Sequence, residues 1–112
     1  MKRLVSIVLI LLLTVSVAYS LTYQIKTQIV SVAITATKLP TTPVVGREYI
    51  RVQNVGAQTV YIGASTVTAD TAATGGIQLL PYGVWQEAYD HTIDVYGIVA
   101  GTTCNVVVEE GK

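Results

Sequence analysis

The feature that most constrains the fold of this chain is an alternation of apolar and polar residues in short runs. It is clearest in residues 47–65, where Ile50 and Val52 alternate with polar neighbours, and Val60 and Ile62 do the same after a turn. A period of two gives a strand one apolar face, whereas a helix needs a period near 3.6. The pattern predicts a β-hairpin with one face turned toward a core.

Turn residues separate this hairpin from further short apolar runs. Within its turn, Gly56 is expected to supply a positive φ, and Asn54 to hydrogen-bond its own backbone. A polar loop at residues 65–76 follows, and then come "IQLL", "VWQEAY", "TIDVYGIVA" and "TCNVVVEE". No helical period occurs outside the N-terminal leader. We therefore expect about six or seven strands in an all-β fold, a small antiparallel β-sandwich of the jelly-roll or immunoglobulin-like kind.

The chain opens with a hydrophobic leader, "MKRLVSIVLILLLTVSVAYS". Lys2 and Arg3 precede an uncharged apolar run at residues 4–19, and small residues surround its end. This layout is typical of a secretory signal peptide, and it predicts an N-terminal signal or anchor helix over residues 1–20. The run is shorter than the roughly 20 residues that span a bilayer, which favours cleavage after Ser20. An uncleaved membrane anchor, in contact with lipid through residues 4–19, is the alternative.

The remainder divides into an N-terminal strand with a Pro-containing connector, residues 21–46, and a sandwich body, residues 47–112. The alternation in residues 21–39 changes phase near Ile29 and Val30, which predicts either one long strand with a bulge or two short strands.

Residues 21–39 carry apolar side chains on both faces in turn, so the segment needs cover on both sides. We expect it either to close its own sandwich or to insert into a neighbouring subunit by β-augmentation. In the second case, Val32→Asp or Ile34→Asp is expected to weaken assembly, because it would bury an unpaired carboxylate between subunits.

The charge and the cysteine content limit the partners and the covalent cross-links expected of this chain. Only 12% of residues are charged and the net charge is zero, so nucleic acid is not an expected partner. Cys104 is the only cysteine and excludes an intrachain disulfide. It shares one face of a strand with Val106 and Val108, which predicts a small buried hydrophobe more than a reactive thiol.

Residues 47–112 resemble the small β-rich virion structural proteins of tailed bacteriophages and related viruses. The phrases that carry the resemblance are "REYIRVQNVGAQTVYIG", "TVT", "GIQLLPYG", "DVYGIVAGTT" and "VVVEEG". The resemblance implies a capsid decoration, head-fibre or tail protein without enzymatic activity, which associates with itself and with other virion or surface proteins. Most such proteins lack a leader. Either the virus has a membrane that the leader enters, or a cellular secreted protein has adopted similar strands.

The densest polar cluster is "EAYDHTID", which contains Glu87, Asp90, His91 and Asp94. A zinc site there would be mostly carboxylate, because the chain has one histidine, and the spacing is not that of a calcium-binding loop. Acids in a turn between strands are ordinary, so we favour a solvated loop and expect no metal and no cofactor.

Two other functions are considered, a hydrolase that uses part of this cluster and a sugar-binding protein that uses the aromatic residues. A hydrolase would pair Cys104 or Ser65 with His91 and Asp94, but neither nucleophile has the flanking residues of a catalytic motif. The seven Tyr residues and Trp85 could stack on sugars, although aromatic residues at alternate strand positions more often pack in a core. We predict a non-enzymatic virion protein, located in the virion or at the cell surface. The alternative is a secreted carbohydrate- or surface-binding module, or a filament subunit, of cellular origin.

Overall fold

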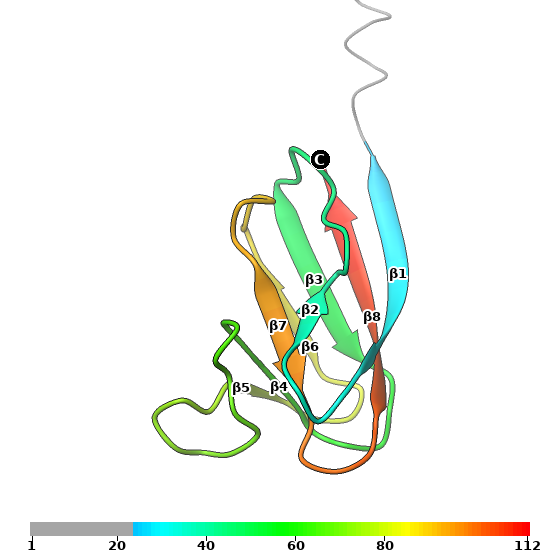
Figure 1. Cartoon of the computed structure of the whole chain (residues 1–112). Helices are drawn as coiled ribbons and strands as arrows, with labels where there is room; N and C mark the ends of the chain where they lie inside the picture. The colour runs from blue at the N-terminus through cyan, green and yellow to red at the C-terminus, as the bar shows by residue number, and fades with distance from the viewer. Residues whose placement is uncertain (1–23) are drawn as a thin grey trace, which may run out of the picture.

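The computed structural model describes residues 24–112, which form two four-stranded antiparallel β-sheets that pack face to face (Figure 1). The strands are β1 (Ile25–Val32), β2 (Thr37–Leu39), β3 (Tyr49–Asn54), β4 (Val60–Gly63), β5 (Ile77–Leu79), β6 (Val84–Glu87), β7 (Val95–Ile98) and β8 (Cys104–Gly111). Within these residues there is no helix, and hence none that is long and apolar enough to cross a membrane. The predicted all-β fold with antiparallel sheets is confirmed. The predicted leader, residues 1–20, lies outside the described residues.

Each strand of the first half of the chain pairs with a strand of the second half. The pairs are β1 with β8, β2 with β7, β3 with β6, and β4 with β5. The chain therefore folds as one long antiparallel ribbon that doubles back at residues 64–76. β8 also pairs with β3, and β7 with β4, which rolls the ribbon into sheets of order β1-β8-β3-β6 and β2-β7-β4-β5.

The core lies between the two sheets, as the alternation predicts. The predicted hairpin at residues 47–65 is wrong, however, because the chain crosses from one sheet to the other after Asn54: β3 pairs with β6 and β8, whereas β4 pairs with β5 and β7. Ile50, Val52 and Val60 are fully buried and Ile62 is 2% exposed. Cys104 faces the same core, together with the other inward-facing residues of β8. Burial of each such aliphatic side chain stabilises the fold by about 1.5–3 kcal/mol, so the packing of these residues is the main source of stability.

The N-terminal segment forms two strands, β1 of eight residues and β2 of three, and the break between them follows Val32. β1 pairs with β8 in unbroken register through Ile29 and Val30, so the break or bulge predicted at that point is wrong. Val30 and Val32 point into the core, whereas Ile25 and Ile29 are 74% and 72% exposed. Ile34 was expected on the buried face but is 62% exposed, because the chain turns between β1 and β2. Both strands pair within the chain, so residues of the predicted N-terminal unit share two sheets with the predicted body. The described residues form eight strands, more than the six or seven predicted, because the three-residue β2 is too short to show an alternation in the sequence.

The prediction of a positive φ at Gly56 is wrong. Among the described residues, positive φ values occur at Gly46 (78°) and Tyr82 (63°). Glycine is needed at position 56 because a Cβ there would overlap the Cys104 Sγ atom. The predicted role of Asn54 is confirmed, since its Oδ1 atom accepts the Gly56 N–H at 3.0 Å.

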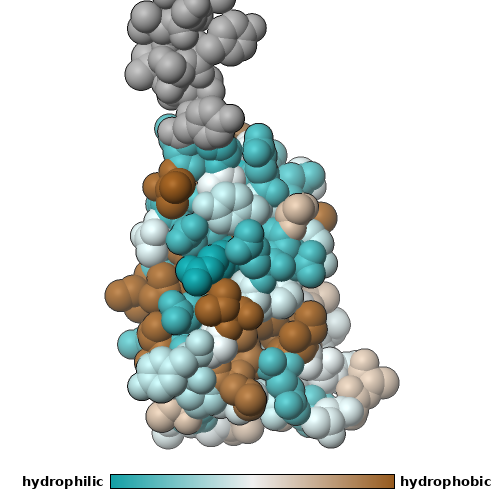
Figure 2. All heavy atoms as spheres, turned by 180° about the vertical axis from the view of Figure 1, so that it is seen from behind, coloured by the Kyte–Doolittle hydropathy of each residue, from teal (hydrophilic) through white to brown (hydrophobic). Residues whose placement is uncertain are grey.

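The two ends of the sandwich differ. Gln24 and Lys112 lie together at one end, which we call the proximal end. The β1–β2, β3–β4, β5–β6 and β7–β8 connections lie at the opposite, distal end (Figure 1). Apolar side chains remain on the surface, and Figure 2 shows several of them between hydrophilic neighbours on the face opposite that of Figure 1. The distal connections carry four of the exposed apolar residues: Ile34, Val55, Leu80 and Tyr82.

Candidate functional site

The largest cluster of polar contacts lies near the proximal end, where the β6–β7 loop (residues 88–94) meets the β2–β3 connector (residues 40–48). At its centre is a buried ion pair between Arg47 and Glu110, whose Nη1 and Oε2 atoms are 2.8 Å apart. The two side chains are 0% and 1% exposed. Charges so deeply buried need further hydrogen bonds to offset their lost hydration.

Those hydrogen bonds come from the backbone of both loops. Arg47 donates from Nε to the Tyr89 carbonyl at 3.1 Å and from Nη2 to the Ile93 carbonyl at 2.7 Å. Glu110 Oε2 also accepts the Val44 N–H at 3.0 Å. The ion pair therefore ties the β2–β3 connector and the β6–β7 loop to β8, and its burial leaves no room for a substrate.

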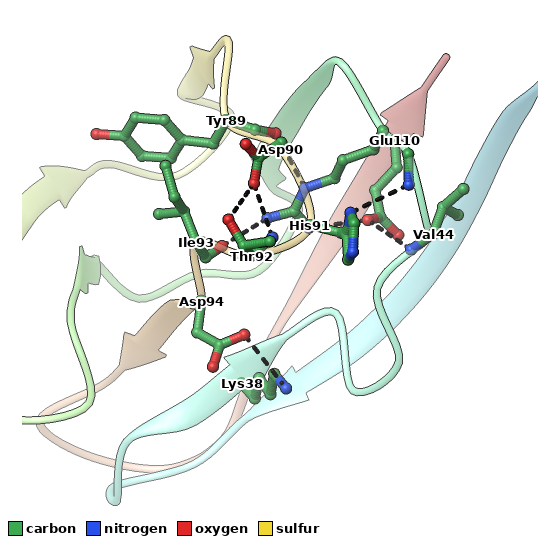
Figure 3. Close-up of polar contacts among 11 residues, drawn as sticks. Lys38, Val44, Tyr89, Asp90, His91, Thr92, Ile93, Asp94 and Glu110 are labelled. Carbon is green, nitrogen blue, oxygen red and sulfur yellow. Dashed lines mark hydrogen bonds and ion pairs between the residues drawn. The ribbon is translucent and has the colours of Figure 1, made fainter.

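The acidic residues of the β6–β7 loop point in different directions (Figure 3). Asp90 accepts hydrogen bonds from the hydroxyl and the N–H of Thr92. His91 Nδ1 accepts the Gly46 N–H at 3.1 Å, and Asp94 forms an ion pair of 3.3 Å with Lys38. Each polar side chain therefore stabilises a loop or a strand contact.

The residues of the "EAYDHTID" cluster do not converge on one point. Glu87 lies on β6, exposed and paired in register with Ile50. In the part of the chain that the structure describes, no three His, Cys, Asp or Glu side chains are arranged to hold a metal ion. Asp90, His91 and Asp94 each make a separate contact that stabilises a loop or joins two parts of the fold.

The candidate nucleophiles are not joined to His91 or Asp94. Cys104 is buried at the distal end of β8, where its Sγ donates to Asn54 Oδ1 at 3.3 Å. His91 contacts the connector near Glu110, and six residues of strand, about 20 Å, separate positions 104 and 110. Ser65 is exposed in the long loop after β4. No Ser-His-Asp or Cys-His-Asp arrangement forms among these residues of the described chain.

The aromatic residues divide between the core and the surface. Trp85 and Tyr89 meet edge to face, with ring centroids 5.9 Å apart, and both pack against the core. Tyr82, at 77% exposure, presents its ring to solvent at the distal end. A sugar would therefore find Tyr82 more accessible than Trp85.

Sequence reasoning missed the Arg47–Glu110 pair. One signal was present, since Glu110 is in phase with Cys104, Val106 and Val108 on the inward face of β8. A carboxylate in that phase must be buried with a partner. The alternation shows that Glu110 needs a cationic partner, but it does not identify which Lys or Arg residue that partner is.

Comparison with known proteins adds no relative: no family model, curated protein or solved structure matches this chain.

Asp90 allows a direct test of the loop geometry. The Thr92 hydroxyl, followed by the Thr92 N–H, lowers the pKa of the Asp90 carboxyl below 3.8. We expect Thr92→Val to raise this pKa toward 3.8, and Thr92→Ser to leave it low, as followed by NMR of the carboxyl carbon. Because the folded pKa is lowered, the carboxylate stabilises the fold above pH 3.8, and this contribution is lost as pH falls through the folded pKa. An unchanged titration in Thr92→Val would contradict the geometry.

Proposed function

We propose that this chain is a non-enzymatic structural or surface protein of a virion, working through contacts of its sandwich with copies of itself or with a larger shell. The strand orders β1-β8-β3-β6 and β2-β7-β4-β5 are those of a jelly roll, an architecture found in viral capsid and lectin domains. A fold alone does not establish a function, so the proposal needs support from the surface.

The observation that carries the proposal is that large apolar side chains are exposed at both ends of the sandwich. At the proximal end, Ile25 is 74% exposed and Val45 is 71% exposed. The distal end presents Ile34, Leu80 and Tyr82, each at least 60% exposed. Tyr82 also holds a left-handed backbone conformation, which residues other than glycine adopt rarely and at a cost in free energy. A small domain with apolar side chains exposed at both ends suits a structural protein that contacts copies of itself or other partners.

The polar residues support a role without catalysis. Three of the side chains considered for a reactive site make structural contacts instead: Asp90 with Thr92, Asp94 with Lys38, and Cys104 with Asn54. The Arg47–Glu110 pair is sealed in the interior.

A second candidate is a secreted carbohydrate-binding module of cellular origin. Its support is the exposed ring of Tyr82, because a tyrosine ring at a loop tip can stack on the apolar face of a sugar. Loss of glycan binding in Tyr82→Ala, measured on a glycan array, would favour this candidate over the virion protein.

The virion proposal predicts where the chain is found and with what mass. We expect it in purified virus particles, with a mature chain that begins at Leu21, because the apolar run is short and is followed by small residues. Intact-mass measurement of the particles tests both points. A mass that retains residues 1–20 would identify a membrane-anchored virion protein, and absence from particles would contradict the proposal. Flanking capsid, portal or terminase genes would support it, and a transporter or glycosidase operon would oppose it.

A further inference from the structure

The four edge strands of the sandwich are unequal. β2 and β5 have three residues each and β6 has four, whereas β1 has eight. In residues 24–112, β8 is the only strand that pairs with β1. Proteins commonly protect sheet edges by keeping them short or by charging them, yet β1 is long and Lys26 is its one charged residue. The edge of β1 is therefore available to a further strand.

The pairing of Gln24 with Lys112 determines the direction in which the backbone N–H and C=O groups of each β1 residue point. Gln24 and Lys112 exchange both backbone hydrogen bonds, at 3.0 and 2.9 Å. Because this direction alternates along an antiparallel strand, even-numbered residues of β1 bond to β8. The N–H and C=O groups of Ile25, Thr27 and Ile29 then point to the free edge. The side chains of these residues lie on the outer face, since Val30 and Val32 face the core.

We propose that β1 pairs antiparallel with β1 of a second copy of this chain, about a two-fold axis at Thr27. In this register Ile25 of each copy lies opposite Ile29 of the other, and the two Thr27 residues face each other. Each of these pairs can exchange two backbone hydrogen bonds, because all three residues direct their N–H and C=O groups outward. The inference rests on the proposed function, and it specifies which surface joins two copies.

The sequence of β1 favours this register over its neighbours. A shift of the axis to Lys26 would place two ammonium groups directly opposite each other, which is destabilising. A shift to Gln28 would set Ile25 against Ser31 and Ile29 against Thr27. The axis at Thr27 pairs both exposed isoleucines, 74% and 72% exposed, with each other and places Lys26 opposite Gln28. Pairing of β1 with β6 of another copy is not self-complementary and would produce rings or open filaments in place of a two-fold dimer.

An exchange of charges tests the register. Ile29→Lys and Ile25→Glu each place a charge against an isoleucine, and we expect each to raise the dimer dissociation constant at least about tenfold. In the double variant the new carboxylate of each copy faces the new ammonium of the other, so the dimer should recover. Within one chain these positions are four residues, about 13 Å, apart on the strand, so recovery reports contact between copies.

The measurement is sedimentation equilibrium of the chain purified from an exporting host, in density-matched detergent where the leader is retained. Ile77→Lys is the control, because it charges an exposed isoleucine on β5, an edge strand of the other sheet, and should leave the dimer intact. A wild-type chain that is monomeric at about 100 µM overturns the inference, as do dimers that persist in the single variants or filaments in place of dimers. None of these results removes the virion proposal, which the particle mass decides separately.

Discussion

Arg47→Met is expected to lower the free energy of unfolding by about 3–5 kcal/mol, because it leaves the Glu110 carboxylate buried without its cation. The Tyr89 and Ile93 carbonyls lose their donors in the same change. For a domain of this size the melting temperature should fall by more than about 10 °C. Urea denaturation followed by circular dichroism measures the change.

Two variants show whether burial is the cause. Arg51→Met removes a cation whose ion pair with Glu109 spans 3.9 Å and is about one-third exposed, so it should cost less than about 1 kcal/mol. Arg47→Met combined with Glu110→Leu removes both buried charges and should be less destabilising than Arg47→Met alone. Equal effects of Arg47→Met and Arg51→Met would show that the buried pair does not hold the loops.

The strands that sequence analysis located are those in which local alternation decides the fold. A strand of four or more residues has a visible period, so the sequence predicts that Ile50, Val52, Val60 and Ile62 face the core. β2, with three residues, has no such period and its position depends on β7. The requirement for glycine at position 56 also cannot be inferred from local sequence, because it arises from close contact with Cys104, which is distant along the chain.

The polar cluster was located from sequence, but its geometry was not. An acid-rich turn between two strands marks the β6–β7 loop, and Asp90 and Asp94 lie in it. Their partners are of two kinds: Thr92 is two residues away, whereas Lys38 lies on another strand. Arg47 and Glu110 are 63 residues apart and meet because β8 passes beside the connector. Such a pair follows from the order of strands in the sheets, which local patterns do not specify.

Val32→Asp is expected to unfold the domain, whereas Ile34→Asp is expected to be tolerated. The sequence places both residues on one apolar face of an N-terminal strand. In the structure Val32 is 0% exposed and paired in register with Cys104, while Ile34 is 62% exposed in the turn after β1. These two positions therefore test whether β1 is an integral strand of the sandwich.

The physical reason lies in hydration. An aspartate at position 32 would enter the core without a cation, at a cost of about 3–5 kcal/mol, which is comparable to the whole stability of a small domain. At position 34 the carboxylate would remain in water, and the change should stay within about 0.5 kcal/mol. Thermal unfolding of the two variants beside the wild type decides the matter. Should Val32→Asp melt as the wild type does, β1 would not be an integral strand of the sandwich, and its pairing with a second copy would lose its basis as well.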